Sequence, residues 1–125
     1  MDSLPDLPKK RNTREADLTP KVLKWFRENH VGSCAIEIKA SAGTRIPASA
    51  LAPHQRLALE AAAKQGIVHK IADNKAKNPF DAFMLKGVPA YVVACFTHHR
   101  VCLVIPVDKW SGATPDHKSS FVIDL

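Results

Sequence analysis

The segment from residue 34 to residue 41, CAIEIKAS, alternates between apolar and polar side chains, which predicts a β-strand. Ile36 and Ile38 then fall on one face, and Glu37 and Lys39 fall on the other. A carboxylate and an ammonium group side by side on a rigid strand suit a metal-dependent phosphodiesterase. A half-exposed strand with two solvated charges has the same pattern, so the pair alone leaves both interpretations open.

The rest of the chain predicts two helices and a group of strands. One helix is expected from Thr19-Pro20 to Gly32, and a second from Pro53 to about Gln65, because proline suits a first helical turn and glycine an end. Residues 42–52 are expected to form a loop. Strand-like runs follow at residues 67–71, 80–85, 90–96, 101–107 and 121–123, with the third and fourth pairing across the turn at 97–100. This order predicts an α/β fold, in which helices flank a mixed central β-sheet.

The composition indicates one domain and a polyanionic partner. A chain of 125 residues suits a single domain, expected at residues 18–125, after a flexible basic arm at residues 1–17. The net charge of +6 favours nucleic acid as the partner. No apolar run approaches the length of a membrane span and the first residues do not resemble a signal peptide, so a cytoplasmic, intracellular protein without a membrane partner is expected.

Two further features could join the Glu37 site. Asp81 follows Pro79-Phe80 at the start of a strand, where it is either a turn residue or a second carboxylate for Mg²⁺. Gln55 and Arg56 open the second helix, where free backbone N–H groups favour phosphate, although an ordinary first helical turn has the same residues. Glu28 lies near the end of the first helix, where a carboxylate opposes the helix dipole. This position hints at a partner such as a cation, although a solvent-exposed glutamate is the commoner explanation.

These residues resemble a known family. An E-x-K strand at residues 37–39, a basic loop, His54-Gln55 opening a helix and the run NPFD at residues 78–81 are similar to the PD-(D/E)xK nuclease superfamily, and most to the RecU-type Holliday junction resolvases. The resemblance covers roughly residues 20–107. It implies a restriction-endonuclease-like fold, a homodimer, and cleavage of DNA phosphodiesters, with branched DNA as a candidate substrate and Mg²⁺ or Mn²⁺ as the cofactor.

The resemblance also implies roles for single residues. Glu37 would bind metal, Lys39 would act on the water or the phosphate, and Gln55 would lie beside them as a third catalytic residue. Glu28 would match the acidic residue that some members carry on the first helix. Asp81 departs from the family order, in which the aspartate precedes the E-x-K strand.

Three explanations of this departure stay open. Asp81 reaches the site from a neighbouring strand, or it is not a ligand. Alternatively, residues 80–85 and 90–96 are the usual Asp and E-x-K strands, and Glu37 and Lys39 are migrated substitutes or the site is inactive.

The basic residues provide the expected nucleic-acid contacts. These residues are Lys9, Lys10, Arg11, Arg45, Arg56, Lys70, Lys75 and Lys77, with Arg100 as a further candidate. A non-catalytic nucleic-acid-binding protein on the same fold is the main rival to a nuclease. An interaction or inhibitor domain without a nucleic-acid role is the third hypothesis.

The three cysteines argue against a disulfide framework. Cys34 is expected to be a small buried hydrophobic residue. A zinc site formed by Cys95, His98, His99 and Cys102 is disfavoured, because zinc sites usually draw their second pair of ligands from further along the chain. Both tryptophans, Trp25 and Trp110, are expected to pack in the core or over the sheet rather than to stack on bases.

Overall fold

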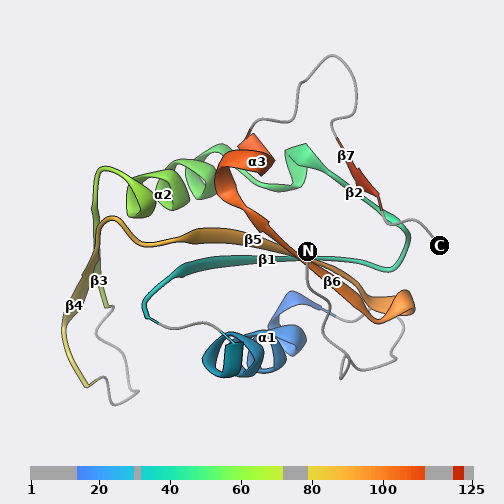
Figure 1. Ribbon diagram of the computed structural model, residues 1–125, viewed down its shortest axis with the longest axis horizontal. Coiled ribbons are helices and arrows are strands. Elements are labelled where there is room, and N and C mark those ends of the chain that lie inside the picture. Colours follow the sequence, from blue (N-terminus) through green and yellow to red (C-terminus); the bar gives the residue numbers. More distant parts are fainter. Residues whose placement is uncertain (1–13, 30–31, 72–78, 112–119, 123–125) are drawn as a thin grey trace.

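Figure 1 shows the computed structural model of the chain, which describes residues 14–29, 32–71, 79–111 and 120–122. The fold is mixed α/β, as the sequence predicts. Along the chain the elements are α1 (Glu15–Asn29), β1 (Ala35–Ser41), β2 (Arg45–Pro47), the 3₁₀ helix η1 (Ala48–Ala50), α2 (Pro53–Ala63), β3 (Ile67–Lys70), β4 (Ala82–Leu85), β5 (Ala90–Phe96), the 3₁₀ helix η2 (Thr97–His99), β6 (Val101–Pro106), α3 (Val107–Ser111) and β7 (Ser120–Val122).

A three-stranded mixed sheet in the order β1-β5-β6 forms the centre of the fold. β1 and β5 are parallel, with Glu37 opposite Val92 and Lys39 opposite Ala94. β5 and β6 are antiparallel and pair across η2, so the pairing predicted for these two strands is confirmed. β5 is the middle strand and is apolar along its whole length, as expected of a strand that is covered on both faces.

Helices cover both faces of this sheet, α1 on one side and α2 with α3 on the other (Figure 1). Alternate residues of β5 divide between two cores: Val93 and Cys95 face α1, whereas Val92 and Ala94 face α2. The α1 core is formed by Leu18, Val22, Phe26, Ile38, Val93, Cys95 and Cys102. The α2 core is formed by Ile46, Leu51, Leu59, Ala90, Val92, Ala94, Phe96, Ile105, Val107 and Trp110.

The first helix begins at Glu15, and the start predicted at Thr19-Pro20 is wrong. The carboxylate of Asp17 accepts a hydrogen bond from the Arg14 N–H at 3.1 Å, which satisfies a free donor at the helix start. Pro20 lies inside the helix, and the Thr19 hydroxyl donates to the Glu15 carbonyl instead of capping. Residues 15–17 therefore belong to α1 and not to the flexible arm, and residues 1–13 of that arm lie outside the described residues.

The expected loop at residues 42–52 contains β2 and η1. β2 pairs with β7, and the side chain of Ile46 between them is buried, which explains why a segment rich in turn residues forms a strand. The strand predicted at residues 121–123 is confirmed as β7, which runs from 120 to 122.

The strands predicted at residues 67–71 and 80–85 do form, but they pair with each other as a separate antiparallel ribbon, β3-β4. Among the described pairings β4 has no bond to β5, so the alternative in which these two are adjacent Asp and E-x-K strands finds no support. The run at 101–107 ends in α3, which the sequence analysis did not predict. Trp110 of α3 is buried, as expected, and its Nε1 donates to the Ala48 carbonyl at 3.1 Å.

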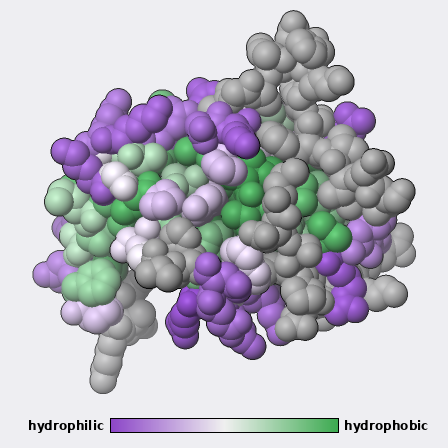
Figure 2. All heavy atoms as spheres, viewed as in Figure 1, coloured by the Kyte–Doolittle hydropathy of each residue, from purple (hydrophilic) through white to green (hydrophobic). Residues whose placement is uncertain are grey.

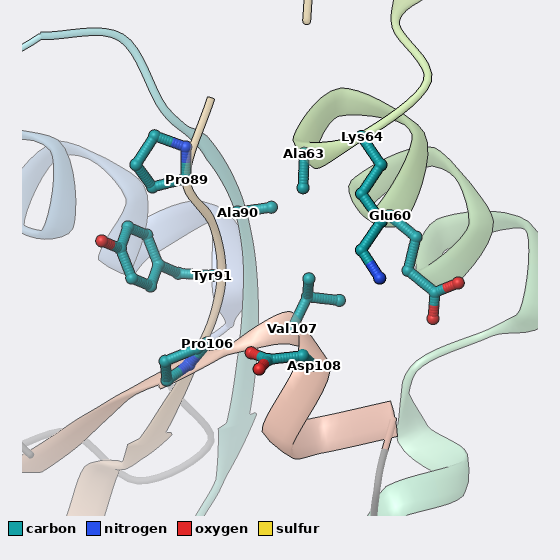
Figure 3. A pocket seen from close by; sticks show the side chains of 9 residues that line it. All are labelled: Glu60, Ala63, Lys64, Pro89, Ala90, Tyr91, Pro106, Val107 and Asp108. Carbon is teal, nitrogen blue, oxygen red and sulfur yellow. The ribbon is translucent and has the colours of Figure 1, made fainter. Parts of the chain in front are cut away.

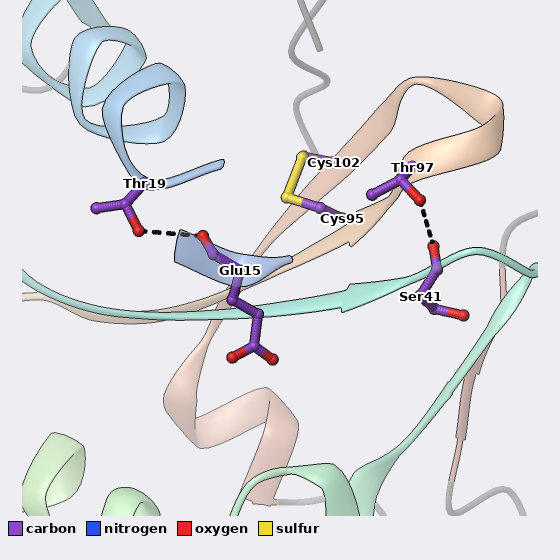
Figure 4. The surroundings of a disulfide bond; sticks show 6 residues. All are labelled: Glu15, Thr19, Ser41, Cys95, Thr97 and Cys102. Atoms are coloured by element: carbon purple, nitrogen blue, oxygen red, sulfur yellow. Dashed lines mark hydrogen bonds between the residues drawn. A yellow bond between two sulfur atoms is a disulfide. The ribbon is translucent and has the colours of Figure 1, made fainter. Parts of the chain in front are cut away.

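Cys95 and Cys102 lie directly opposite each other on β5 and β6 and form a disulfide (Figure 4), a bond that the sequence analysis did not predict. Close to it, the hydroxyl of Thr97 donates to the Ser41 carbonyl at 3.3 Å and ties the ends of β1 and β5 together. None of the described helices is long and apolar enough to cross a membrane.

Candidate functional site

Glu37, Lys39 and Gln55 form one hydrogen-bonded cluster between β1 and α2. The Lys39 Nζ donates to the Gln55 Oε1 at 3.0 Å, and the Gln55 Nε2 donates to the Glu37 Oε1 at 3.1 Å. The Lys39 Nζ also lies 3.4 Å from the Glu37 Oε1. The three residues that the sequence analysis put together as catalytic are thus in mutual contact.

Local structure explains why the three side chains meet. Glu37 and Lys39 are two residues apart on a strand, so both point to the face that α2 covers. Gln55 lies in the first turn of α2, where its Oε1 also accepts the Ala52 N–H at 3.1 Å. Because this oxygen is held by two donors, the amide nitrogen is directed at Glu37.

The cluster keeps hydrogen-bonding capacity for a ligand. An ammonium group has three N–H donors, and Gln55 and Glu37 engage two of those of Lys39. The second carboxylate oxygen of Glu37 makes no hydrogen bond or ion pair within the described part of the chain. The Lys39 side chain is only 12% exposed and that of Glu37 is 29% exposed, so their interaction is weakly screened by solvent.

A smaller hollow of about 250 Å³ lies on the opposite face of β1, between that strand and α1. It is lined by Glu15, Ala16, Thr19, Leu23, Ile36, Glu37 and Ile38. Ile36 and Ile38 pack against the α1 core, so the side chains of Glu37 and Lys39, which alternate with them, point to the other face of the strand. Glu15 of α1 is therefore on the other side of β1 from the hydrogen-bonded cluster.

The other two predicted metal ligands, Glu28 and Asp81, do not contact Glu37. Glu28 is exposed and lies 13 residues beyond Glu15 on α1, which corresponds to about 20 Å along the helix axis. Asp81 is exposed just before β4, and its backbone carbonyl accepts the Ile71 N–H at 2.8 Å. No contact between described residues joins either one to Glu37, and these residues contain no group of three or more His, Cys, Asp or Glu side chains that could hold a metal.

The predicted nucleic-acid contacts are described only in part. Arg45 on β2, Arg56 on α2 and Lys70 on β3 are exposed, and Arg56 lies 3.9 Å from Glu60. Arg100 is exposed too and has a left-handed backbone, with φ of 55°. Lys9, Lys10, Arg11, Lys75 and Lys77 lie outside the described residues.

The cysteine chemistry differs from a zinc site. Cys95 and Cys102 bind each other, so they are not free as thiolate ligands beside His98 and His99. Cys34 packs against the α1 core as expected, although it is only half-buried. This burial raises the pKa of the Cys34 thiol above its ordinary value of 9.0, because desolvation disfavours the thiolate.

A larger hollow of about 620 Å³ lies at the other end of α2 (Figure 3). Its floor is apolar, with Ala63, Ala90 and Val107, and the charged side chains of Lys64 and Asp108 stand at its rim. None of Glu37, Lys39 and Gln55 lines it. The hollow is therefore separate from the hydrogen-bonded cluster.

The chain was compared with protein-family models, curated proteins and solved structures, and none of them matches.

Proposed function

We propose that the chain is a metal-dependent endodeoxyribonuclease whose site is built on Glu37, Lys39 and Gln55. The observation that carries the proposal is the closed set of contacts among a carboxylate, an ammonium group and an amide that come from β1 and α2. The arrangement of a strand with E-x-K, a helix, a parallel neighbouring strand and then an antiparallel one supports a restriction-endonuclease-like core. The net charge of +6 supports a polyanionic substrate.

The donor set fits Mg²⁺ or Mn²⁺. Mg²⁺ is usually held by one or two carboxylates, with waters and substrate phosphate completing its coordination. Glu37 would supply its remaining carboxylate oxygen as the single protein carboxylate, and waters and substrate phosphate would complete the coordination. When bound, such an ion lowers the pKa of a coordinated water and neutralises charge on phosphate oxygens.

The protein groups would then have distinct tasks. Lys39 directs its remaining N–H donor at the scissile phosphate and stabilises the negative charge that grows there during hydrolysis. Gln55 holds the ammonium and the carboxylate in fixed positions, because each end of its amide binds one of them. Arg56, the next residue of α2, adds positive charge for the DNA backbone.

Cleavage assays test this proposal directly. Labelled four-way junction, duplex and single-stranded DNA are incubated with Mg²⁺, with Mn²⁺ and with a chelator. We expect metal-dependent cutting by the wild type, loss of cutting in Glu37→Ala and Lys39→Ala with folding intact, and normal cutting in Asp108→Ala. The control removes an exposed carboxylate of α3 that lies outside the cluster.

The same assay separates the nuclease from its main rival. If no substrate is cut with either metal while salt-sensitive binding persists, the protein is a non-catalytic nucleic-acid-binding module. Cutting that survives Lys39→Ala removes Lys39 from the mechanism. A homodimer stays a prediction of the family resemblance and is tested by the mass of the protein in solution.

A further inference from the structure

We propose that the ribbon formed by β3 and β4 is a docking surface for unpaired bases of a nucleic-acid strand. This inference rests on the proposed function only in taking nucleic acid as the partner. It assigns substrate recognition to a part of the molecule that contributes nothing to the Glu37 cluster.

The ribbon stands apart from the central sheet and is unusually apolar for an exposed element. It lies at the left end of the molecule in Figure 1, and Figure 2 shows hydrophobic residues gathered there. Four of the six large hydrophobic residues exposed in the described part of the chain belong to it or to its approach: Val68, Phe80, Phe83 and Met84. Exposed apolar groups gathered in this way mark a binding surface more often than single ones do.

Both faces of the ribbon present apolar groups. Val68 and Met84 are directly opposite on one face and are 68% and 70% exposed. On the other face Phe83 pairs with His69, and the two rings lie 5.1 Å apart at their centroids with an angle of 33° between their planes. Phe80, just before β4, is 53% exposed. Flat rings with free area are suited to stacking on bases.

The charge of this segment indicates which partner fits. The described residues on and around the ribbon, 64–71 and 79–87, contain three lysines and one aspartate, with no glutamate or arginine. Lys70 is exposed on β3, and the stem of Lys86 lies over Gly66, at 3.6 Å from the position that a Cβ would take there. A second copy of the ribbon would bring these like charges together, whereas a polyanion would neutralise them.

Unpaired bases fit this surface better than duplex DNA does. In a duplex the base faces are stacked on each other, so a ring on the protein surface has none to contact. In a single strand or at a branch point the faces are free, and aromatic side chains bind them with little sequence preference. The combination of Phe80, Phe83 and surrounding lysines thus matches a strand with exposed bases and phosphates.

The test compares binding to single-stranded and duplex oligonucleotides with the same number of phosphates, in a chelator so that nothing is cut. The full chain is used. We expect Phe80→Leu and Phe83→Leu, which keep an apolar side chain but lose the ring, each to weaken single-strand binding about tenfold and to change duplex binding less than twofold. Thermal melting shows that the variants are folded.

Two controls complete the experiment. Leu57→Ala removes an apolar group that is 59% exposed on α2 and should change neither affinity. Lys70→Ala should lower the affinity for both single-stranded and duplex DNA and reduce the salt dependence of binding, because it removes a charge rather than a ring. Single-stranded DNA carrying 5-iodouracil should crosslink under ultraviolet light to the peptide that contains Phe80 and Phe83.

Some outcomes would overturn the inference. One is an equal loss of binding affinity for duplex and single-stranded DNA in the phenylalanine variants. Another is no loss of affinity in either variant. A concentration-dependent increase in mass that Met84→Lys abolishes would assign the ribbon to self-association instead. Preferential single-strand binding in a protein that cuts no DNA would leave the inference standing while the nuclease proposal fails.

Discussion

The amide nitrogen of Gln55 donates a hydrogen bond to the carboxylate of Glu37 at 3.1 Å, although the two residues are 18 positions apart. The contact joins the first turn of α2 to β1. Gln55 cannot rotate its amide without losing the two donors that hold its oxygen. This residue therefore fixes how the carboxylate and the ammonium group of the candidate site are presented.

Substitution of Gln55 tests that role. Gln55→Ala removes bonds to Glu37 and Lys39, and we expect DNA cleavage to fall about a hundredfold, while the free energy of unfolding falls by only about 1 kcal/mol. Gln55→Glu keeps an acceptor for Lys39 but places a second negative charge beside Glu37, so it should not restore cleavage. Parallel cleavage and denaturant-unfolding curves make the comparison. A large loss of stability in Gln55→Ala would mean that the cluster mainly holds α2 on the sheet.

Glu37 and Glu28 separate the candidate metal ligand from a carboxylate outside the cluster. Because the Glu37 carboxylate is the one in the cluster, Glu37→Gln should weaken Mn²⁺ binding by at least about tenfold. Glu28→Gln, at an exposed position near the end of α1, should leave Mn²⁺ affinity unchanged. Titration calorimetry with each variant measures the effect. Equal affinities for wild type and Glu37→Gln would exclude Glu37 from the metal site.

The bond between Cys95 and Cys102 should stabilise the fold only under oxidising conditions. It closes a loop of eight residues, for which the chain-entropy relation predicts about 2.5 kcal/mol. We expect dithiothreitol to lower the melting temperature of the wild type by about 10 °C. The double variant Cys95→Ser, Cys102→Ser should show no such response. Identical melting of the wild type with and without reductant would show that the two thiols are unpaired in solution.

The thiol of Cys34 should make the stability of the folded protein depend on pH in the alkaline range. Its thiol pKa is raised in the folded protein, so the folded state holds the proton more tightly than the unfolded chain does. This contribution to stability is complete below the ordinary value of 9.0 and is lost as the pH rises through the folded pKa. Alkylation by iodoacetamide should have its rate midpoint at a higher pH in the folded protein than in urea. Coincident midpoints would contradict this, and Cys34→Ser is the control for other sites.

Leu18 tests where the folded domain begins. Its side chain is fully buried in the α1 core, within the turn that the sequence analysis placed outside the helix. Leu18→Ala should lower the free energy of unfolding by about 3 kcal/mol, because it leaves a cavity. Leu23→Ala, at a position that is 49% exposed on the same helix, should cost clearly less. Similar losses for the two variants would argue that α1 does not pack as described.

Much of the fold follows from local sequence patterns. The alternation in residues 34–41 predicts β1, because a strand with one apolar face has apolar residues at every second position. The apolar run at 90–96 predicts β5, because a strand buried on both faces is apolar throughout. The start of α1 is not evident from the sequence, because the capping carboxylate is that of Asp17 inside the first turn and Pro20 in the second turn has the pattern of a helix start. The sequence predicts β3 and β4 as two strands, but their separation from the central sheet has no local signal.

That Glu37 and Lys39 share one face of a strand follows from the sequence alone, since it depends only on the period of two. Two other relationships follow only from the folded structure: Gln55 joins the cluster, and Cys95 lies opposite Cys102. Each of these depends on how distant segments are packed and in which register strands pair. The packing of distant segments and the register of the strands depend on how both hydrophobic cores are buried together, and no short stretch of chain specifies them.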